Sequence, residues 1–263
     1  MGGRRMPNAL LERLKTKKSI IGMQCFTGSA ALVEIMGFSG FDWVSIDMEH
    51  TTISFADVEN LTRAAEVSGM IPMVRVAENE PLLIAKALDA GAVGVIVPHI
   101  QTAADLRKAL ASARFAPEGD RGKCGQVRGS HYGADGVPWS EFWKKKNDSV
   151  VIMPLVEERE GIENLDEILA VDGVDVLWLG IGDLAQSYGV PGAPMNKEPL
   201  LSVAREAIAK TRAAGKVLLA PSSPVHTHDY CRELLEMGFG GISYGTDTSI
   251  FRNVCRDAMA IVK

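Results

Sequence analysis

The chain has 263 residues, of which 46% are hydrophobic and 23% charged, a balance typical of a globular protein with a large core. Its formal net charge of −5 argues against nucleic acid as a partner, and no apolar run is long enough to suggest a membrane span. The 4 cysteines lack metal-ligand spacing, so we expect free thiols in a reducing cytoplasm rather than a structural zinc site.

Short apolar runs recur along the chain and are separated by segments of helical length. The predicted strands are residues 19–25, 42–47, 71–76, 93–98, 150–156, 174–180, 216–221 and 240–245. Most are apolar throughout rather than alternating, which is typical of strands covered on both faces in a parallel sheet. Amphipathic helices are predicted between them, for example over 81–91, which ends in a glycine, and over 200–216.

Eight strand–helix units in about 250 residues have the size of a closed (β/α)8 barrel, so we predict one such domain over residues 1–263. An open, doubly wound sheet is the alternative, but it usually has fewer strands and a glycine-rich nucleotide-binding turn. The first turn here reads CFTGSAAL rather than GxGxxG, and no GxxxxGK[ST] motif occurs. The one long interruption, residues 115–149, is rich in glycine and predicts a lid or binding loop.

Polar side chains follow the predicted strands at the points where the strands end. They are Gln24 after the first strand, Asp47, Glu49 and His50 after the second, Arg75 after the third, His99 after the fourth, Glu157 after the fifth and Asp183 after the sixth. Because the carboxyl ends of barrel strands converge on one mouth, we expect these side chains to meet there. So much charge at one rim is costly unless it serves a site.

Glu157 and Asp183, on neighbouring strands, are hard oxygen ligands that suit Mg²⁺, Mn²⁺ or a similar octahedral ion. Arg75 has the planar fork that holds a carboxylate or a developing oxyanion. His50 titrates near neutral pH and can act as a general base, and Asp47 is close enough in the chain to orient its imidazole.

Metal, arginine and histidine together predict chemistry beside a carbonyl group. The ion chelates a 2-oxo acid, acidifies the neighbouring C–H bond and stabilises the enolate. A Schiff-base lysine is the other route to an enolate equivalent. No lysine ends a predicted strand, and Lys216 begins one, so the metal route is favoured.

The sequence resembles the HpcH/HpaI family of metal-dependent, class II pyruvate aldolases from about residue 8 to its C-terminus. The motifs that carry the resemblance are GFDWVSIDMEH, PMVRV, ALDAGAVGVIVP, ARFAPEGDRG, VEEREGIENLDEIL, GIGDLAQSYG, RAAGK and GTDTSIF. This family includes aldolases of 4-hydroxy-2-oxoheptanedioate and 2-dehydro-3-deoxyglucarate. The resemblance implies reversible cleavage of a 4-hydroxy-2-oxo acid to pyruvate and an aldehyde, with Mg²⁺, Mn²⁺ or Co²⁺ as Lewis acid, in cytoplasmic catabolism of aromatic compounds.

The resemblance also implies roles for matching residues. Glu157 and Asp183 would bind the metal, and Arg75 would contact the keto oxygen of pyruvate. His50, paired with Asp47, would mediate proton transfer through water.

Further implied roles concern the substrate carboxylate and the assembly. The backbone N–H groups around Gly182 and Asp183 would bind the carboxylate of pyruvate. Asp89 would be lent to the site of a neighbouring subunit in a homo-oligomer, and a plain surface salt bridge at the end of its predicted helix is the alternative. Family members form hexamers as trimers of dimers with the last barrel helix exchanged, which here covers roughly 246–262.

Three departures from the family pattern bear on substrate choice more than on enolate formation. Ile181 stands where the family usually has proline, and Gln24 stands where a tryptophan is common in the substrate pocket. The segment after Arg121 is about one residue shorter than the family pattern. The serine of this segment that makes a contact in the family is therefore not assigned to a residue here.

Several residues keep open alternatives. Glu49 either orients a neighbouring side chain or pairs with an arginine at a subunit contact, and His99 is expected to be structural. Arg121 and Arg128 either contact an anionic aldehyde or hold the long loop closed. Two rival functions share the barrel: oxaloacetate decarboxylation through the same enolate, and a binding protein that has lost catalysis.

Overall fold

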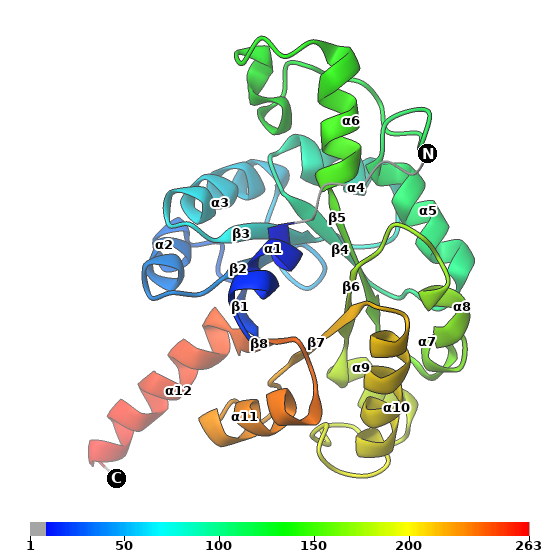
Figure 1. Cartoon of the computed structure of the whole chain (residues 1–263). Coiled ribbons are helices and arrows are strands. Elements are labelled where there is room, and N and C mark those ends of the chain that lie inside the picture. The colour runs from blue at the N-terminus through cyan, green and yellow to red at the C-terminus, as the bar shows by residue number, and fades with distance from the viewer. Residues whose placement is uncertain (1–8, 263) are drawn as a thin grey trace.

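Neighbouring strands pair in parallel and in chain order, and β8 pairs with β1, so the sheet closes into a barrel (Figure 1). This computed structural model describes residues 9–262. Its strands are β1 Ile20–Cys25, β2 Trp43–Asp47, β3 Ile71–Arg75, β4 Gly94–Val97, β5 Val151–Val156, β6 Val176–Leu179, β7 Val217–Pro221 and β8 Gly241–Thr246. The prediction of a (β/α)8 barrel is confirmed.

Helices alternate with the strands and surround the barrel. They are α1 Ala9–Thr16, α2 Ala30–Phe38, α3 Phe55–Val67, α4 Pro81–Asp89, α5 Ala103–Ala113, η1 Arg128–Gly133, α6 Trp139–Ser149, α7 Arg159–Glu163, α8 Leu165–Leu169, α9 Ile181–Ser187, α10 Leu200–Ala213, α11 His228–Met237, α12 Asp247–Met259 and η2 Ala260–Val262. Capping residues begin several of them, as in α3, where Ser54 and Asp57 form a reciprocal capping box. Among the described residues, no helix has the length and apolar character needed to cross a membrane.

The barrel is closed at the end where its strands begin. There Leu10 of α1 is fully buried and belongs to a core cluster inside the barrel. That cluster includes the first residues of five strands, Ile20, Trp43, Ile71, Val151 and Val176. A second, larger cluster fills the space between the strands and the outer helices. Because α1 blocks one end, the other end of the barrel, where the strands finish, is the open mouth.

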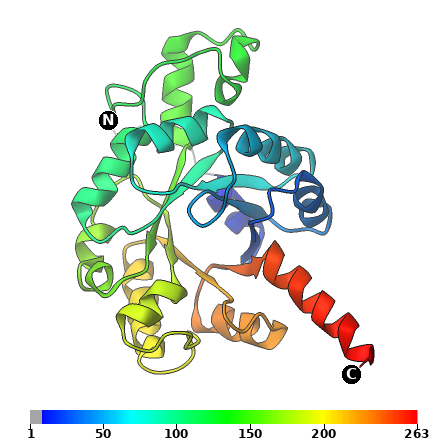
Figure 2. The same cartoon turned by 180° about the vertical axis from the view of Figure 1, so that it is seen from behind.

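The insertion over residues 115–149 contains η1 and α6 and joins the end of α5 to the start of β5. It projects from the barrel on a different side from α12, as both views show (Figures 1 and 2). Since it precedes a strand, the insertion lies at the closed end, where it lines a cavity together with Val93 and Val150 just before β4 and β5. A lid role therefore applies only to the mouth of a neighbouring chain, and it stays a prediction.

Candidate active site

Asp47 and Arg75 face each other where β2 and β3 end, because they are partners in the register of these strands. The Arg75 Nε–H donates a hydrogen bond to Asp47 Oδ2, and Arg75 Nη1 lies 3.0 Å from Glu49 Oε2. Asp47 is fully buried and Arg75 is 8% exposed. Two carboxylates thus fix the guanidinium plane, and its remaining N–H groups can bind a substrate oxygen.

His50 follows β2 and stands at the rim with a half-exposed side chain. Its backbone N–H donates to Asp47 Oδ1 at 2.8 Å, whereas its ring Nε2 lies 3.6 Å from Glu49 Oε2. The structure therefore does not show the expected contact of Asp47 with the imidazole. Asp47 has one oxygen on Arg75 and the other on the His50 backbone, so Glu49 is the carboxylate nearest the ring.

Glu157, directly after β5, is 5% exposed. Its Oε1 accepts a hydrogen bond from the backbone N–H of His99 at 3.1 Å, and its Oε2 lies close against Gly180. Burial is the main cause that raises the pKa of Glu157 to about 7; the hydrogen bond and charge of His99 oppose the rise, and the charges of Glu49 and Asp183 add to it. A carboxylate held among other acids in this way is a strong candidate for a cation ligand.

His99 is a site residue for which the sequence predicted only a structural role. Its ring Nε2 lies 3.3 Å from Glu49 Oε1, and its Nδ1 lies 3.6 Å from Glu157 Oε1 and 3.2 Å from Glu158 Oε1. Burial lowers the pKa of His99, but the charges of these carboxylates outweigh burial and raise it above its ordinary value. The signal that could have revealed the role of His99 is its position at a strand end on the rim.

A cavity of about 160 Å³ lies in the mouth and collects most of the predicted site residues. Its lining includes Gln24, His50, Arg75, Glu157, Gly182 and Asp183. The amide of Gln24 donates to Ser243 Oγ at 3.3 Å, so a polar group occupies this wall of the cavity. Trp178 of β6 also lines the cavity, and it packs edge-on against Trp43 inside the barrel.

Asp183 lies in the first turn of α9, which follows β6 directly and takes Gly180 as its N-cap. The helix begins at Ile181, the position where proline was expected, and this side chain is 4% exposed. An isoleucine thus starts the helix at the same place. The backbone N–H groups of Gly182 and Asp183 belong to the first turn, which is a favourable place for a negatively charged group.

The donor groups of the mouth fit a divalent cation. Glu157 and Asp183 line the same cavity, and the charge of Asp183 contributes to the raised pKa of Glu157. One ligand atom from each of Glu49, His99 and Glu157 also lies within 4.8 Å of the others. Carboxylate oxygens with an imidazole nitrogen at hand suit Mg²⁺, Mn²⁺ or Co²⁺. Such a cation would relieve the repulsion among these acids.

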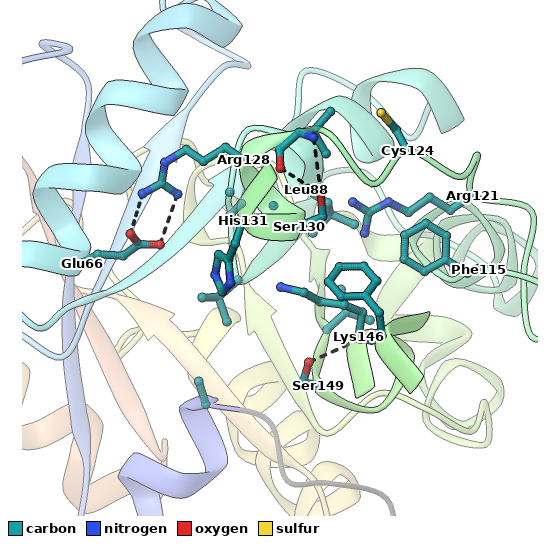
Figure 3. A pocket seen from close by; sticks show the side chains of 18 residues that line it. Glu66, Leu88, Phe115, Arg121, Cys124, Arg128, Ser130, His131, Lys146 and Ser149 are labelled. Atoms are coloured by element: carbon teal, nitrogen blue, oxygen red, sulfur yellow. Dashed lines mark hydrogen bonds and ion pairs between the residues drawn. The ribbon is translucent and has the colours of Figure 1, made fainter. Parts of the chain in front are cut away.

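Asp89 is the predicted site residue that does not reach the mouth of its own chain. It ends α4 at the closed end of the barrel, where Arg121 Nη2 lies 2.6 Å from its Oδ1. Arg121 is 7% exposed and enters a cavity on the inner side of the insertion (Figure 3). Within one chain, these two residues hold the insertion against α4.

Comparison with known proteins places this site in context. A family model described as HpcH/HpaI aldolase/citrate lyase matches residues 21–254. The chain is 32% identical to 2-dehydro-3,6-dideoxy-6-sulfogluconate aldolase of Pseudomonas putida, with 95% of each chain covered. It is 34% identical to hydroxypyruvate/pyruvate aldolase of Sagittula stellata, with 73% of this chain and 74% of the relative covered. A solved structure of an HpcH/HpaI aldolase/citrate lyase family protein from Burkholderia cenocepacia matches with a TM-score of 0.87 at 30% identity, covering 97% of this chain and 99% of the other.

Proposed function

Since this chain belongs to the HpcH/HpaI aldolase/citrate lyase family, we propose that it is a class II aldolase that reversibly cleaves a 4-hydroxy-2-oxo acid into pyruvate and an aldehyde. Its relatives are named as aldolases of deoxy-keto sugar acids and of hydroxypyruvate or pyruvate, which supports a carbon–carbon lyase. The observation that carries the proposal is that Arg75, Glu157 and Asp183 line one cavity at the barrel mouth.

Glu157 and Asp183 would hold a divalent cation, Mg²⁺, Mn²⁺ or Co²⁺. The bound ion would polarise the 2-oxo group and so make the neighbouring carbon more acidic. His99 supports this arrangement, because its backbone N–H fixes one oxygen of Glu157. Groups that hydrogen-bond to a metal ligand and fix its orientation often contribute to the affinity for the metal.

The side chains of the mouth can bind and orient the 2-oxo acid. The first-turn N–H groups of Gly182 and Asp183 would donate hydrogen bonds to its carboxylate at the N-terminus of α9. Arg75, held rigid by Asp47 and Glu49, would donate to the 2-oxo oxygen and hold the negative charge that develops there. Because this clamp is preorganised, little reorganisation is needed as the charge forms.

Cleavage requires one proton to leave and one to return. His50, half-exposed at the rim, would take the proton of the 4-hydroxyl group through a water molecule. The C4–O bond then becomes a carbonyl, the C3–C4 bond breaks, and its electron pair passes to the enolate of pyruvate. His50 returns the proton to C3, which completes pyruvate and restores the side chain. The aldol addition is the reverse of these steps.

We further propose that the protein works as a homo-oligomer, a hexamer built as a trimer of dimers, in which α12 is exchanged between subunits. Helix α12 extends away from its own barrel (Figure 1), and Phe251, Val254 and Met259 on it are 67%, 58% and 58% exposed. The insertion and Asp89 at the closed end of one chain would then complete the aldehyde side of a neighbouring mouth.

The test is release of pyruvate from racemic 4-hydroxy-2-oxoheptanedioate and from 2-keto-3-deoxy sugar acids, coupled to lactate dehydrogenase. Protein stripped with EDTA should be inactive, and Mg²⁺, Mn²⁺ or Co²⁺ should restore it. Activity that survives stripping, or full activity in Glu157→Gln, would contradict the proposal. Oxaloacetate as sole substrate, and aldol addition from pyruvate plus aldehyde, separate a decarboxylase from an aldolase. Tight binding of pyruvate without turnover would indicate a binding protein.

A further inference from the structure

The cavity in the barrel mouth has two unlike walls. One wall, at the ends of β2, β3, β5 and β6, carries the ionisable side chains that line the cavity, which are His50, Arg75, Glu157 and Asp183. The other wall lies on the side of β7 and β1, the two neighbours of β8 in the closed sheet. Its side chains are Pro221, Ser223 and Gln24, and none of them is charged. The steps proposed above for the reaction use none of these three residues.

Gln24 is the buried polar group of this second wall. It is 9% exposed, and its Nε2–H donates a hydrogen bond to Ser243 Oγ of β8 at 3.3 Å. Its carbonyl oxygen Oε1 accepts no hydrogen bond from residues 9–262, and it is not one of the unpartnered atoms that the protein covers completely. Because Gln24 lines the cavity, Oε1 is an acceptor that is open to a bound molecule.

Ser223 gives the same wall a second free polar group. It follows β7 and is half-buried, and its hydroxyl group forms no hydrogen bond with the part of the chain that the structure describes. The backbone N–H of Ser222 donates to the carbonyl oxygen of Ser243 at 2.8 Å, which joins this loop to the strand that also holds the Gln24 amide. One open acceptor and one open hydroxyl group therefore lie on the same side of the cavity.

The position of the bound 2-oxo acid decides which of its atoms meets this wall. Its carboxylate is assigned to the first turn of α9 and its 2-oxo oxygen to Arg75, so both groups lie against the charged wall. C3 is the third substituent of the planar C2 atom and points away from both groups, toward Gln24. In pyruvate, C3 carries only hydrogen and would leave Oε1 of Gln24 without a partner, which is unfavourable for a covered polar atom.

We propose that the preferred substrate carries a hydroxyl group on C3 and is thus a 3,4-dihydroxy-2-oxo acid rather than a 3-deoxy acid. This inference rests on the proposed aldolase function and names its substrate class. The C3 hydroxyl group would donate to Gln24 Oε1 and accept from Ser223 Oγ. Cleavage follows the steps above: His50 takes the proton of the 4-hydroxyl group, the C3–C4 electron pair passes to the enolate, and the proton returns to C3. The products are hydroxypyruvate and an aldehyde.

A hydroxyl group on C3 fits this wall better than a carboxylate does. The amide oxygen of Gln24 is only an acceptor, and an ionised carboxylate has no hydrogen to donate to it. Among the described residues that line the cavity, Arg75 and His50 are the side chains able to carry a positive charge, and both belong to the other wall. A second carboxylate, as in oxaloacetate, would therefore lie beside Gln24 without a cation.

The experiment compares three 2-oxo acids that differ at C3, each titrated isothermally into the full chain in the presence of Mg²⁺. Hydroxypyruvate carries the hydroxyl group, pyruvate carries only hydrogen, and 3-fluoropyruvate carries a polar atom that cannot donate a hydrogen bond. Hydroxypyruvate should bind about tenfold more tightly than either of the others, because it alone pairs with the covered amide oxygen.

Gln24→Met keeps the length of the side chain and removes the amide, so the affinity ratio of hydroxypyruvate to pyruvate should fall by about tenfold. Thr211→Val is the matched control and should keep the ratio of the parent protein. Thr211 is 1% exposed and has an unpartnered hydroxyl group, but it lies on α10, outside the mouth. Thermal unfolding shows whether each variant is folded, and the three acids test the inference in the parent protein without any variant.

Exchange of the C3 hydrogens for deuterium, followed by proton NMR, reports enolate formation without an aldehyde and so tests the aldolase separately. Hydroxypyruvate that binds no more tightly than pyruvate would overturn this inference, and exchange of pyruvate in that case would leave the aldolase proposal standing. Equal affinities for 3-fluoropyruvate and hydroxypyruvate would overturn it as well, because the hydrogen bond would then contribute nothing. Tighter binding of hydroxypyruvate without exchange in either acid would support recognition of the C3 hydroxyl group and contradict the aldolase mechanism.

Discussion

Glu157 is the residue whose environment most clearly indicates that the site binds a ligand. It is 5% exposed, and it shares the mouth with Glu49 and Asp183, which both oppose its ionisation. Without a cation, the neutral form of this carboxyl group is favoured up to about pH 7, because its pKa is raised to about 7. The ionised form of Glu157 lowers the stability of the fold. A role in binding therefore explains a glutamate at this position better than a role in stability does.

Glu157→Gln should therefore stabilise the metal-free protein at high pH. The pKa of Glu157 rises from 4.5 in the unfolded chain to about 7 in the folded chain. Between these two pH values, the folded chain keeps a proton on Glu157 that the unfolded chain has lost. Folding stability falls as pH rises through this window, and the loss reaches about 3 kcal/mol above it. Urea unfolding in EDTA should show the glutamine variant more stable than the parent near about pH 8 and little changed near about pH 4.

Glu158→Gln is the control for this measurement, because its side chain is 28% exposed and should gain less. A Glu157→Gln variant whose stability advantage was the same at both pH values would show that the carboxyl group is not strained by its surroundings. Addition of Mn²⁺ should stabilise the parent protein and leave the glutamine variant almost unaffected.

At the scale of elements, the short turn from β6 into α9 positions the site. Gly180 caps α9 with φ of −82°, a conformation open to any residue, so its lack of a side chain has another reason. A Cβ there would lie 2.6 Å from Glu157 Cβ and 2.7 Å from Glu157 Oε2. Glycine at this point lets the Glu157 side chain lie directly against the backbone.

Gly180→Ala should displace the Glu157 carboxylate and weaken Mn²⁺ binding by about tenfold to a hundredfold, the usual effect of disturbing the support of a metal ligand. Gly182→Ala is a close control, because a Cβ at Gly182 meets nothing within 4 Å and its backbone N–H remains. Both affinities can be measured by isothermal titration. Equal affinities in the two variants would show that the close approach at Gly180 does not position the ligand.

At the scale of the whole molecule, α12 is a helix whose apolar residues are not covered by packing within one chain. Phe251, Val254 and Met259 recur on it at helical spacing and stay exposed, while contacts of α12 with the barrel are made to β1 and β8 near its start. An apolar stripe of this kind normally packs against another surface. The chain that supplies this surface is proposed to be a second copy.

Phe251→Asp combined with Val254→Asp should split the oligomer, because two charges cannot be buried unpaired in a subunit contact. Light scattering after size exclusion should then show the mass fall toward that of one chain, 28.3 kDa. Arg256→Asp, an exposed and polar position on the same helix, should leave the assembly largely intact. A parent protein that already runs at 28.3 kDa would contradict the assembly proposal.

The strand pattern could be read from the sequence because burial on both faces makes each barrel strand apolar over its whole length. Each of the eight predicted runs contains most or all of one observed strand, and their ends differ by at most two residues. The residues that meet at the mouth were predictable for a related reason. Parallel strands end on one side, so Arg75, Glu157 and Asp183 had to converge.

The sequence alone thus determined the barrel, the convergence of polar strand ends and, through its motifs, the family. Only the tertiary structure decided which atoms pair: Asp47 holds Arg75 and the backbone of His50, and His99 lies between Glu49 and Glu157. Periodicity depends on which face of an element is buried, whereas these contacts depend on side-chain torsions and loop paths between segments far apart in the chain.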